Sequence, residues 1–125
     1  QIADMLSLPY EKVYKTLVTQ GNSKNYYVFV IPIAEELDMK KAARAVGEKS
    51  IEMIHVKDLL SLTGYIRGGC SPIGMKKKFP SYFHSTAVDF ETIYVSAGVR
   101  GLQLEISPAA LIDFVEGIVA PVACF

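Results

Sequence analysis

The segment Tyr26–Ile31 constrains the fold more than any other, because its run of residues is apolar on both faces of an extended chain. This pattern is typical of a central strand that is buried on both sides of a sheet. The preceding stretch Tyr14–Gln20 also favours a strand, and the turn-forming residues 21–25 separate the two. The sequence therefore predicts a hairpin of Tyr14–Gln20 with Tyr26–Ile33 at the centre of a sheet.

Two helices are predicted in the middle of the chain. Asp38 is a candidate N-cap for a helix that ends at Gly47, and apolar residues recur within it at helical spacing. Those apolar residues are Met39, Ala42, Ala43 and Val46. A second helix is expected over Val56–Thr63, after a short strand near Ser50–Ile54.

The two ends of the chain complete the predicted fold. Alternating apolar residues favour a strand pair of Glu91–Ala97 with Leu102–Ile106, and Ser107-Pro108 opens a final helix. We expect its apolar side to carry Leu111, Ile112, Val115, Ile118 and Val119. The opening stretch Ile2–Val13 is predicted as helical pieces broken near Leu8-Pro9. The fold class is therefore α/β, with a mixed, largely antiparallel sheet or partial barrel surrounded by helices.

Composition sets limits on the kind of protein. The 125 residues are 50% hydrophobic and 21% charged, which fits one domain over residues 1–125. The chain contains no apolar run of about 20 residues and no charged start followed by an apolar segment, so we expect a cytoplasmic protein. The formal net charge is zero, which argues against a strongly electrostatic nucleic-acid binder.

The glycine loop Gly68–Gly74 is the strongest functional lead from residues alone. Three glycines in seven residues let the backbone approach a ligand closely, and successive N–H groups can converge on an oxyanion. The alternative interpretation is a tight turn with a purely structural role, which would need the same glycines. The loop does not match a P-loop, because Met75 precedes the lysine and no Ser or Thr follows it. The adjacent run Lys76, Lys77 and Lys78 is either a solvated turn or a local anion-binding patch.

Other candidate groups are less specific. Cys70 could act as a nucleophile only with His55 or His84 as its base, and no local signature supports either pairing. Two histidines and two dispersed cysteines do not make a zinc site, so no metal is expected. Lys15 is either a solvated side chain on an open strand or a fixed cation aimed at a phosphate or a polarised carbonyl.

Several motifs occur in an order that resembles the YbaK/EbsC family. This family comprises free-standing relatives of the editing domain of bacterial prolyl-tRNA synthetases. The resemblance runs from about Val13 to the final helix. The matching segments are Val13–Leu17, Gly64-Tyr65, Gly68–Gly74, Lys76-Lys77, Ile93–Gly98 and Arg100–Leu102.

The resemblance implies an enzyme that removes wrongly attached amino acids from tRNA, most of all cysteine from tRNA for proline. It implies the acceptor end of aminoacyl-tRNA as the partner, with prolyl-tRNA synthetase as a possible second one, and neither cofactor nor membrane. In the mechanism proposed for the family, the thiol of the misplaced cysteine attacks its own ester. The protein then positions the ester and stabilises the oxyanion without supplying a nucleophile.

Site residues follow from the resemblance position by position. Lys15 corresponds to the lysine implicated in activity, and Gly68–Pro72 to the loop that holds the aminoacyl end. The implied catalytic set is Lys15, Gly68, Gly69 and Cys70, the last for its loop position rather than its thiol. The implied substrate-binding set is Ser71, Pro72, Ser96, Arg100 and Gln103. The implied tRNA-binding set is Lys76, Lys77 and Lys78.

Two departures from the family keep a second function open. Gln103 stands where many relatives carry an acidic residue, which puts a role for a carboxylate there in doubt. The resemblance also implies that the native N-terminal segment of the family is largely absent from this chain. The alternative is a non-catalytic module of the same fold that binds a nucleotide or a protein.

Overall fold

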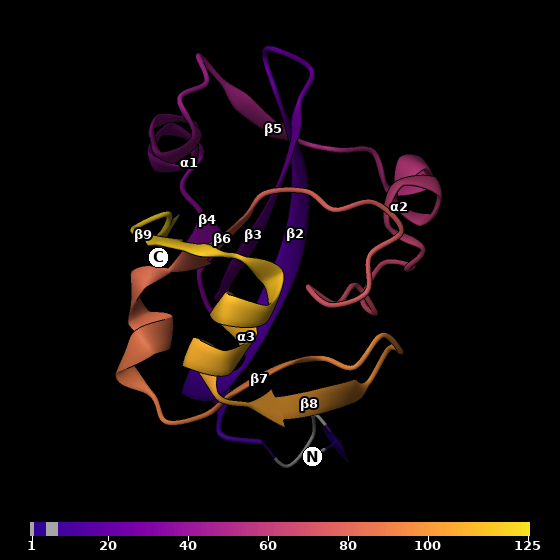
Figure 1. Ribbon diagram of the computed structural model, residues 1–125, viewed down its shortest axis with the longest axis vertical. Coiled ribbons are helices and arrows are strands. Elements are labelled where there is room, and N and C mark those ends of the chain that lie inside the picture. The colour runs from indigo at the N-terminus through magenta and orange to yellow at the C-terminus, as the bar shows by residue number, and fades with distance from the viewer. Residues whose placement is uncertain (1, 5–7) are drawn as a thin grey trace.

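A five-stranded sheet forms the centre of the computed structural model, which describes residues 2–4 and 8–125 (Figure 1). Its strand order is β5-β2-β3-β6-β9. The β2 strand pairs antiparallel with β3 and β5, whereas β6 pairs in parallel with both β3 and β9. The bounds are β2 Tyr14–Gly21, β3 Tyr26–Pro32, β5 Ile51–Met53, β6 Ser81–His84 and β9 Ile118–Ala120.

The predicted central hairpin is confirmed. Lys15 pairs with Ile31 in the β2–β3 ladder, and the four residues from Val28 to Ile31 are each 0% exposed. The turn closes through a hydrogen bond from the N–H of Gly21 to the carbonyl of Asn25, and Lys24 adopts a φ of 78°. Strand β3 lies between β2 and β6, and its residues are buried on both faces, as the apolar run predicts.

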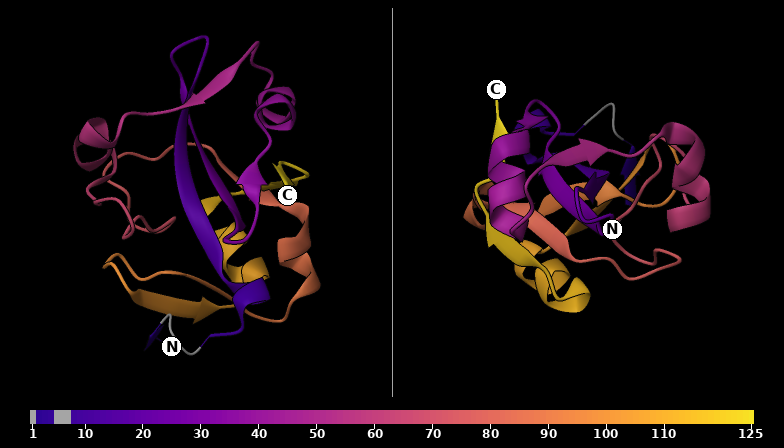
Figure 2. Two further views of the ribbon diagram at one scale, coloured as in Figure 1. Left: turned by 180° about the vertical axis from the view of Figure 1, so that it is seen from behind. Right: turned by 90° about the horizontal axis from the view of Figure 1, so that it is seen from above.

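Two smaller sheets extend this core. One has the order β1-β8-β7, and the other pairs β4 with β10. An isolated parallel bridge between Val13 and Tyr94 joins the start of β2 to β7, so the sheet curves toward the β7–β8 pair as a partial barrel would (Figure 2). The bounds are β1 Ile2–Asp4, β4 Glu36–Leu37, β7 Ile93–Ser96, β8 Leu102–Ile106 and β10 Ala123–Cys124.

Two of the three α-helices in the described residues begin at the predicted caps. The side chain of Asp38 accepts hydrogen bonds from the backbone of Lys40 and Lys41 at the start of α1 (Met39–Val46), and Ser107 caps α3 (Pro108–Val115). The α2 helix (Val56–Thr63) ends at Gly64, which adopts a φ of 85°. None of these helices is long and apolar enough to cross a membrane.

Opposite faces of β3 pack against different elements. Phe29 and Ile31 contact the buried alanines of α1, whereas Val30 packs in a cluster with Leu111 of α3. Val28, on the same face as Val30, packs in a cluster with Cys70 of the glycine loop. The glycine loop and α3 therefore cover neighbouring parts of one sheet face, and α1 covers the other.

Three expectations were wrong or incomplete. Ile2–Asp4 is a strand rather than a helix, because it pairs with β8, and among the described residues of that stretch only Tyr10–Lys12 is helical, as a single 3-10 turn. Residues 5–7 of that stretch lie outside the described part. The last helix ends at Val115, since Glu116 adopts a left-handed φ of 56°, so Ile118 and Val119 belong to β9. The β6 strand was not predicted at all.

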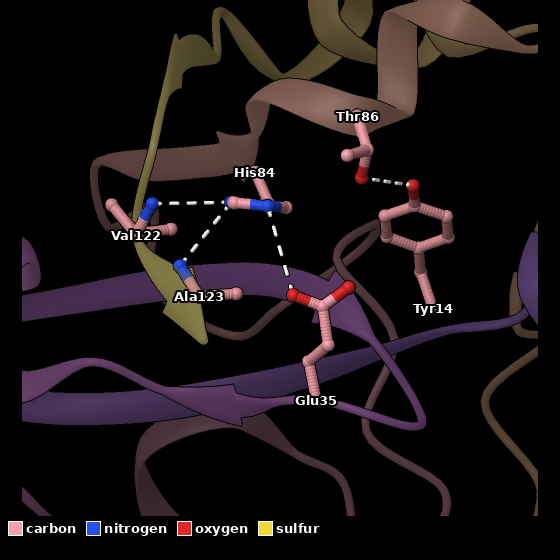
Figure 3. Close-up of polar contacts among 6 residues, drawn as sticks. All are labelled: Tyr14, Glu35, His84, Thr86, Val122 and Ala123. Carbon is pink, nitrogen blue, oxygen red and sulfur yellow. Dashed lines mark hydrogen bonds and ion pairs between the residues drawn. The ribbon is translucent and has the colours of Figure 1, made fainter. Parts of the chain in front are cut away.

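His84, the last residue of β6, fixes the C-terminal segment to the sheet (Figure 3). Its Nδ1 accepts hydrogen bonds from the backbone N–H groups of Val122, at 3.1 Å, and Ala123, at 3.2 Å. Its Nε2 lies 3.8 Å from a carboxylate oxygen of Glu35. An imidazole that accepts at Nδ1 must carry its proton at Nε2, so the neutral ring fits this environment. Burial lowers the pKa of His84, Glu35 opposes that shift, and Lys41 adds to it.

Candidate functional site

A cavity of about 660 Å³ lies between β2, α2, the glycine loop and the β7–β8 turn. This volume falls within the range of about 300–1,000 Å³ that is usual for small-molecule sites. Its polar lining groups converge from four separate elements. Those predicted site residues that line it are Lys15, Gly68, Cys70, Ser96, Arg100 and Gln103. The structure thus brings half of the twelve implied residues to one cavity.

Lys15 reaches the cavity from an unpaired stretch of strand edge. The β5 strand covers β2 only from Thr19 to Gly21, which leaves the outer edge beside Lys15 without a strand partner among the described residues. The ammonium group lies 4.0 Å from the carboxylate of Glu36, whose side chain is 82% exposed. Because an exposed ion pair at this distance contributes little, Lys15 remains available to a ligand.

The backbone of the glycine loop is partly committed to its own structure. Gly68 and Gly74 adopt φ values of 86° and 73°, which residues with a Cβ rarely adopt. The N–H of Gly69 donates to the carbonyl of Ile66 at 3.0 Å. This corrects the expectation that three successive amides face a ligand, because Gly69 is already engaged. Within residues 2–4 and 8–125, no hydrogen-bond acceptor takes the N–H of Gly68 or Cys70.

Arg100 connects the glycine loop to the β7–β8 turn. Its Nε and Nη2 both donate to the carbonyl of Arg67, at 3.2 and 2.7 Å. A Cβ added to Gly68 would lie 3.0 Å from Arg100 Nε, and one added to Gly69 would lie 3.2 Å from the backbone nitrogen of Arg100. The loop and the turn therefore pack closely, and a Cβ at either glycine would force its neighbours to shift by a few tenths of an ångström. Arg100 lines the cavity, and its guanidinium also connects the β7–β8 turn to the carbonyl of Arg67.

Tyr65 braces the same two segments and was not assigned a role from the sequence. Its hydroxyl donates to the carbonyl of Ile73, and a Cβ on Gly98 would lie 3.1 Å from its ring. The Gly64-Tyr65 motif therefore has a structural purpose. The apolar wall of the cavity was missed as well, since Met53, Ile54, Val56 and Leu59 give no separate signal in the sequence. Their spacing is that of an ordinary strand and helix.

The remaining implied residues lie elsewhere. Ser71 is buried and accepts a hydrogen bond from the N–H of Ile73, so it shapes the loop. Pro72, Lys77 and Lys78 line a separate hollow on the other side of the loop, and Lys76 donates its N–H to the carbonyl of Thr63. Pro72 of the predicted substrate-binding set thus lies with Lys77 and Lys78 of the predicted tRNA-binding set, away from the main cavity.

Burial raises the pKa of the Cys70 thiol to about 11, a shift that a hydrogen bond with Thr63 partly opposes. The thiol therefore stays protonated near neutral pH, and the thiolate is the form that acts as a nucleophile. Neither histidine approaches it within the contacts of the described residues: His84 binds the C-terminal segment, and His55 is exposed. Among the described residues, no three His, Cys, Asp or Glu side chains gather in a group that could hold a metal ion.

The fold is that of a small α/β domain, with a cavity of modest size whose lining includes Lys15, Gly68 and Cys70. The family model of the aminoacyl-tRNA editing domain matches residues 1–114, and the chain belongs to that family. The predicted resemblance and fold class are confirmed.

Similar proteins agree with this assignment. The chain is 51% identical to an Enterococcus faecalis protein provisionally named Cys-tRNA(Pro)/Cys-tRNA(Cys) deacylase EbsC, over 93% of this chain and 71% of that protein. It is 29% identical to the proline–tRNA ligase of Thermosipho africanus over 62% of this chain and 14% of the ligase. A crystal structure described provisionally as a trans-editing enzyme for prolyl-tRNA synthetase shares the fold, with a TM-score of 0.89 and 20% identity, over 100% of this chain and 87% of that one.

Proposed function

We propose that this protein is a trans-editing deacylase that removes cysteine from tRNA charged for proline. The observation that carries the proposal is that Lys15, Gly68 and Cys70 all line one cavity in a chain of the editing family. The 51% identity to a protein provisionally named a Cys-tRNA(Pro)/Cys-tRNA(Cys) deacylase supports cysteine as the amino acid. Prolyl-tRNA synthetase is the natural second partner, because its editing domain is related to this chain.

The proposed reaction uses the substrate's own nucleophile. The cysteinyl sulfur attacks the ester carbonyl carbon, the bond from that carbon to the ribose oxygen breaks, and the thiol proton passes to the released ribose hydroxyl. The products are uncharged tRNA and a cyclic thiolactone. Holding the thiol and the ester in line can contribute about 7–11 kcal/mol toward the barrier in favourable cases.

The protein's own groups act on charge and position. The N–H groups of Gly68 and Cys70 are the donors proposed for the developing oxyanion, since that of Gly69 is engaged. Lys15 is proposed to meet the ester oxygen or the phosphate of the terminal nucleotide. The apolar wall of Met53, Val56 and Leu59 would surround the amino-acid side chain and exclude water from it.

A deacylation assay with the full-length protein tests the proposal directly. We expect rapid release of cysteine from Cys-tRNA for proline, and the relative rates on Ala-tRNA for proline and on correctly charged Cys-tRNA define the specificity. The thiolactone or its hydrolysis product is identified by mass spectrometry. Binding of these tRNAs without any turnover would instead indicate the non-catalytic module, for which Gln103 is the residue to examine first.

Removing the Cys70 thiol is expected to leave turnover within about twofold of the wild type, because a protonated, buried thiol cannot act as a nucleophile. The Cys70→Ala variant is compared with Cys124→Ala in the same assay. Iodoacetamide labelling followed by mass spectrometry provides a second test: Cys124 should react at pH 7.5, and Cys70 should not. A loss of activity of 100-fold in a folded Cys70→Ala variant would show that the enzyme supplies the thiol.

A further inference from the structure

The glycine loop separates the main cavity from a second hollow of about 210 Å³. Pro72 and Gly74 line this second hollow, whereas Gly68 and Cys70 line the main one. Since Cys70 and Pro72 are two residues apart, their Cα atoms lie within about 7.6 Å of each other. The two hollows are therefore close enough for adjacent units of one polymer to occupy both.

The second hollow is built from two walls, which an exposed ion pair connects. One wall is the segment from Pro72 to Phe79, and the other is the C-terminal end of α3, with Phe114 and Val115. Lys78 from the first wall forms an ion pair with Glu116, which ends α3. In Figure 1 the α3 helix lies on the side of the sheet that faces the viewer. Its last two residues, Phe114 and Val115, line the hollow.

The chemistry of this hollow differs from that of the apolar core. Phe114 is 71% exposed, although large apolar side chains in a helix of this size are usually buried. Lys77 is exposed and has no ion-pair partner among the described residues, since Lys78 is the lysine that binds Glu116. An exposed aromatic ring beside a free cation is the arrangement that binds a nucleobase by stacking and its phosphate by charge.

We propose that this second hollow binds an unpaired nucleotide of the tRNA acceptor strand, next to the terminal nucleotide that enters the main cavity. Phe114 stacks on the base, and Lys77 contacts its phosphate. This inference rests on the proposed function, because the deacylation substrate supplies the strand. A neutral protein can hold an RNA end in this way, since one base and one or two phosphates require only a local patch rather than a basic surface.

The test compares two substrates of different length. We expect Phe114→Ala to raise KM for Cys-tRNA about fivefold or more, by the loss of one stacked base, with kcat unchanged. The cysteinyl ester of adenosine ends at the terminal nucleoside, so its hydrolysis should not change. Phe114→Tyr keeps the ring and should behave as the wild type, and Phe125→Ala removes a 97% exposed ring elsewhere as a matched control.

The contribution of Lys77 is tested separately, by the salt dependence of tRNA affinity. Replacing Lys77 with glutamine should lower the slope of log affinity for uncharged tRNA against log salt concentration by about one, whereas Lys49→Gln should leave the slope unchanged. The inference would be overturned if Phe114→Ala left both the tRNA affinity and the KM for Cys-tRNA unchanged. It would also be overturned if Phe114→Ala raised KM for the adenosine ester as much as for Cys-tRNA. If the wild type hydrolyses neither substrate, the proposed function fails, and the affinity of the Phe114 variants for uncharged tRNA still decides the second site.

Discussion

Replacing Lys15 with alanine is expected to slow deacylation of Cys-tRNA by about 100- to 1,000-fold, the usual effect of removing one preorganised group that stabilises transition-state charge. Lys15 is one of the residues that line the main cavity, and it lies on the uncovered edge of β2. Its one ion pair, at 4.0 Å to an exposed carboxylate, contributes little to folding. The fold should therefore survive the change.

The controls for Lys15 separate charge from position. Lys15→Gln keeps much of the length of the side chain without its charge, and it should be nearly as inactive as Lys15→Ala. Lys57→Ala removes an exposed lysine from α2, beside the cavity residue Val56, and should keep wild-type activity. Thermal denaturation of each variant checks the fold. A folded Lys15→Ala variant with full turnover would remove the lysine from the mechanism.

Replacing His84 with alanine is expected to lower the free energy of unfolding by about 2–4 kcal/mol. The imidazole Nδ1 accepts from two buried backbone N–H groups, those of Val122 and Ala123, and each unsatisfied buried donor costs about 1–3 kcal/mol. The C-terminal strand β10 would lose the attachment that Figure 3 shows. Urea denaturation at pH 7.5 measures the difference.

Acid should weaken the same attachment in the wild type. The pKa of His84 is lowered in the folded protein, chiefly by burial, so the neutral ring stabilises the fold above the unfolded pKa of about 6.5. That contribution is lost as the pH falls through the folded pKa. Protonation also removes the acceptor at Nδ1 and places a hydrogen against two N–H groups. The free energy of unfolding should therefore decline below about pH 6.5.

Two variants test whether His84 causes this decline in the free energy of unfolding. An asparagine at position 84 offers an amide oxygen close to the position of Nδ1 and does not titrate, so His84→Asn should flatten the decline. The exposed His55 is the matched control, because its side chain caps no helix residue and His55→Asn should leave the decline unchanged. An equal decline in His84→Asn and in the wild type would assign the effect to groups other than His84.

Signals that lie within a few residues of one another predicted much of the fold. The cap at Asp38, the proline after Ser107 and the turn before Tyr26 each act over three or four residues, so the sequence displays them directly. The β6 strand escaped prediction because its pairs are parallel and join residues more than 30 positions apart. The strand character of Ile2–Asp4 likewise depends on β8, about 100 residues later.

The candidate site was predicted less completely than the fold. The residues of the glycine loop could be listed, but whether an amide faces a ligand or another carbonyl depends on the conformation of the loop. The N–H of Gly69 bonds to Ile66, which no spacing rule indicates. The sequence also left the orientation of Lys15 open, because the length of β5 decides how much of the β2 edge is covered. Loops and cavities form between elements, so they depend on tertiary packing.

The position of β9 in the chain has a consequence for synthesis on the ribosome. Its residues, Ile118–Ala120, complete the central sheet by pairing with β6, although they lie close to the C-terminal end of this chain. Until they emerge, a nascent chain presents the backbone of β6 as an open edge that could pair with another chain. Closure of the sheet therefore has to wait until β9 has emerged, and the interval before that is when aggregation threatens this protein most.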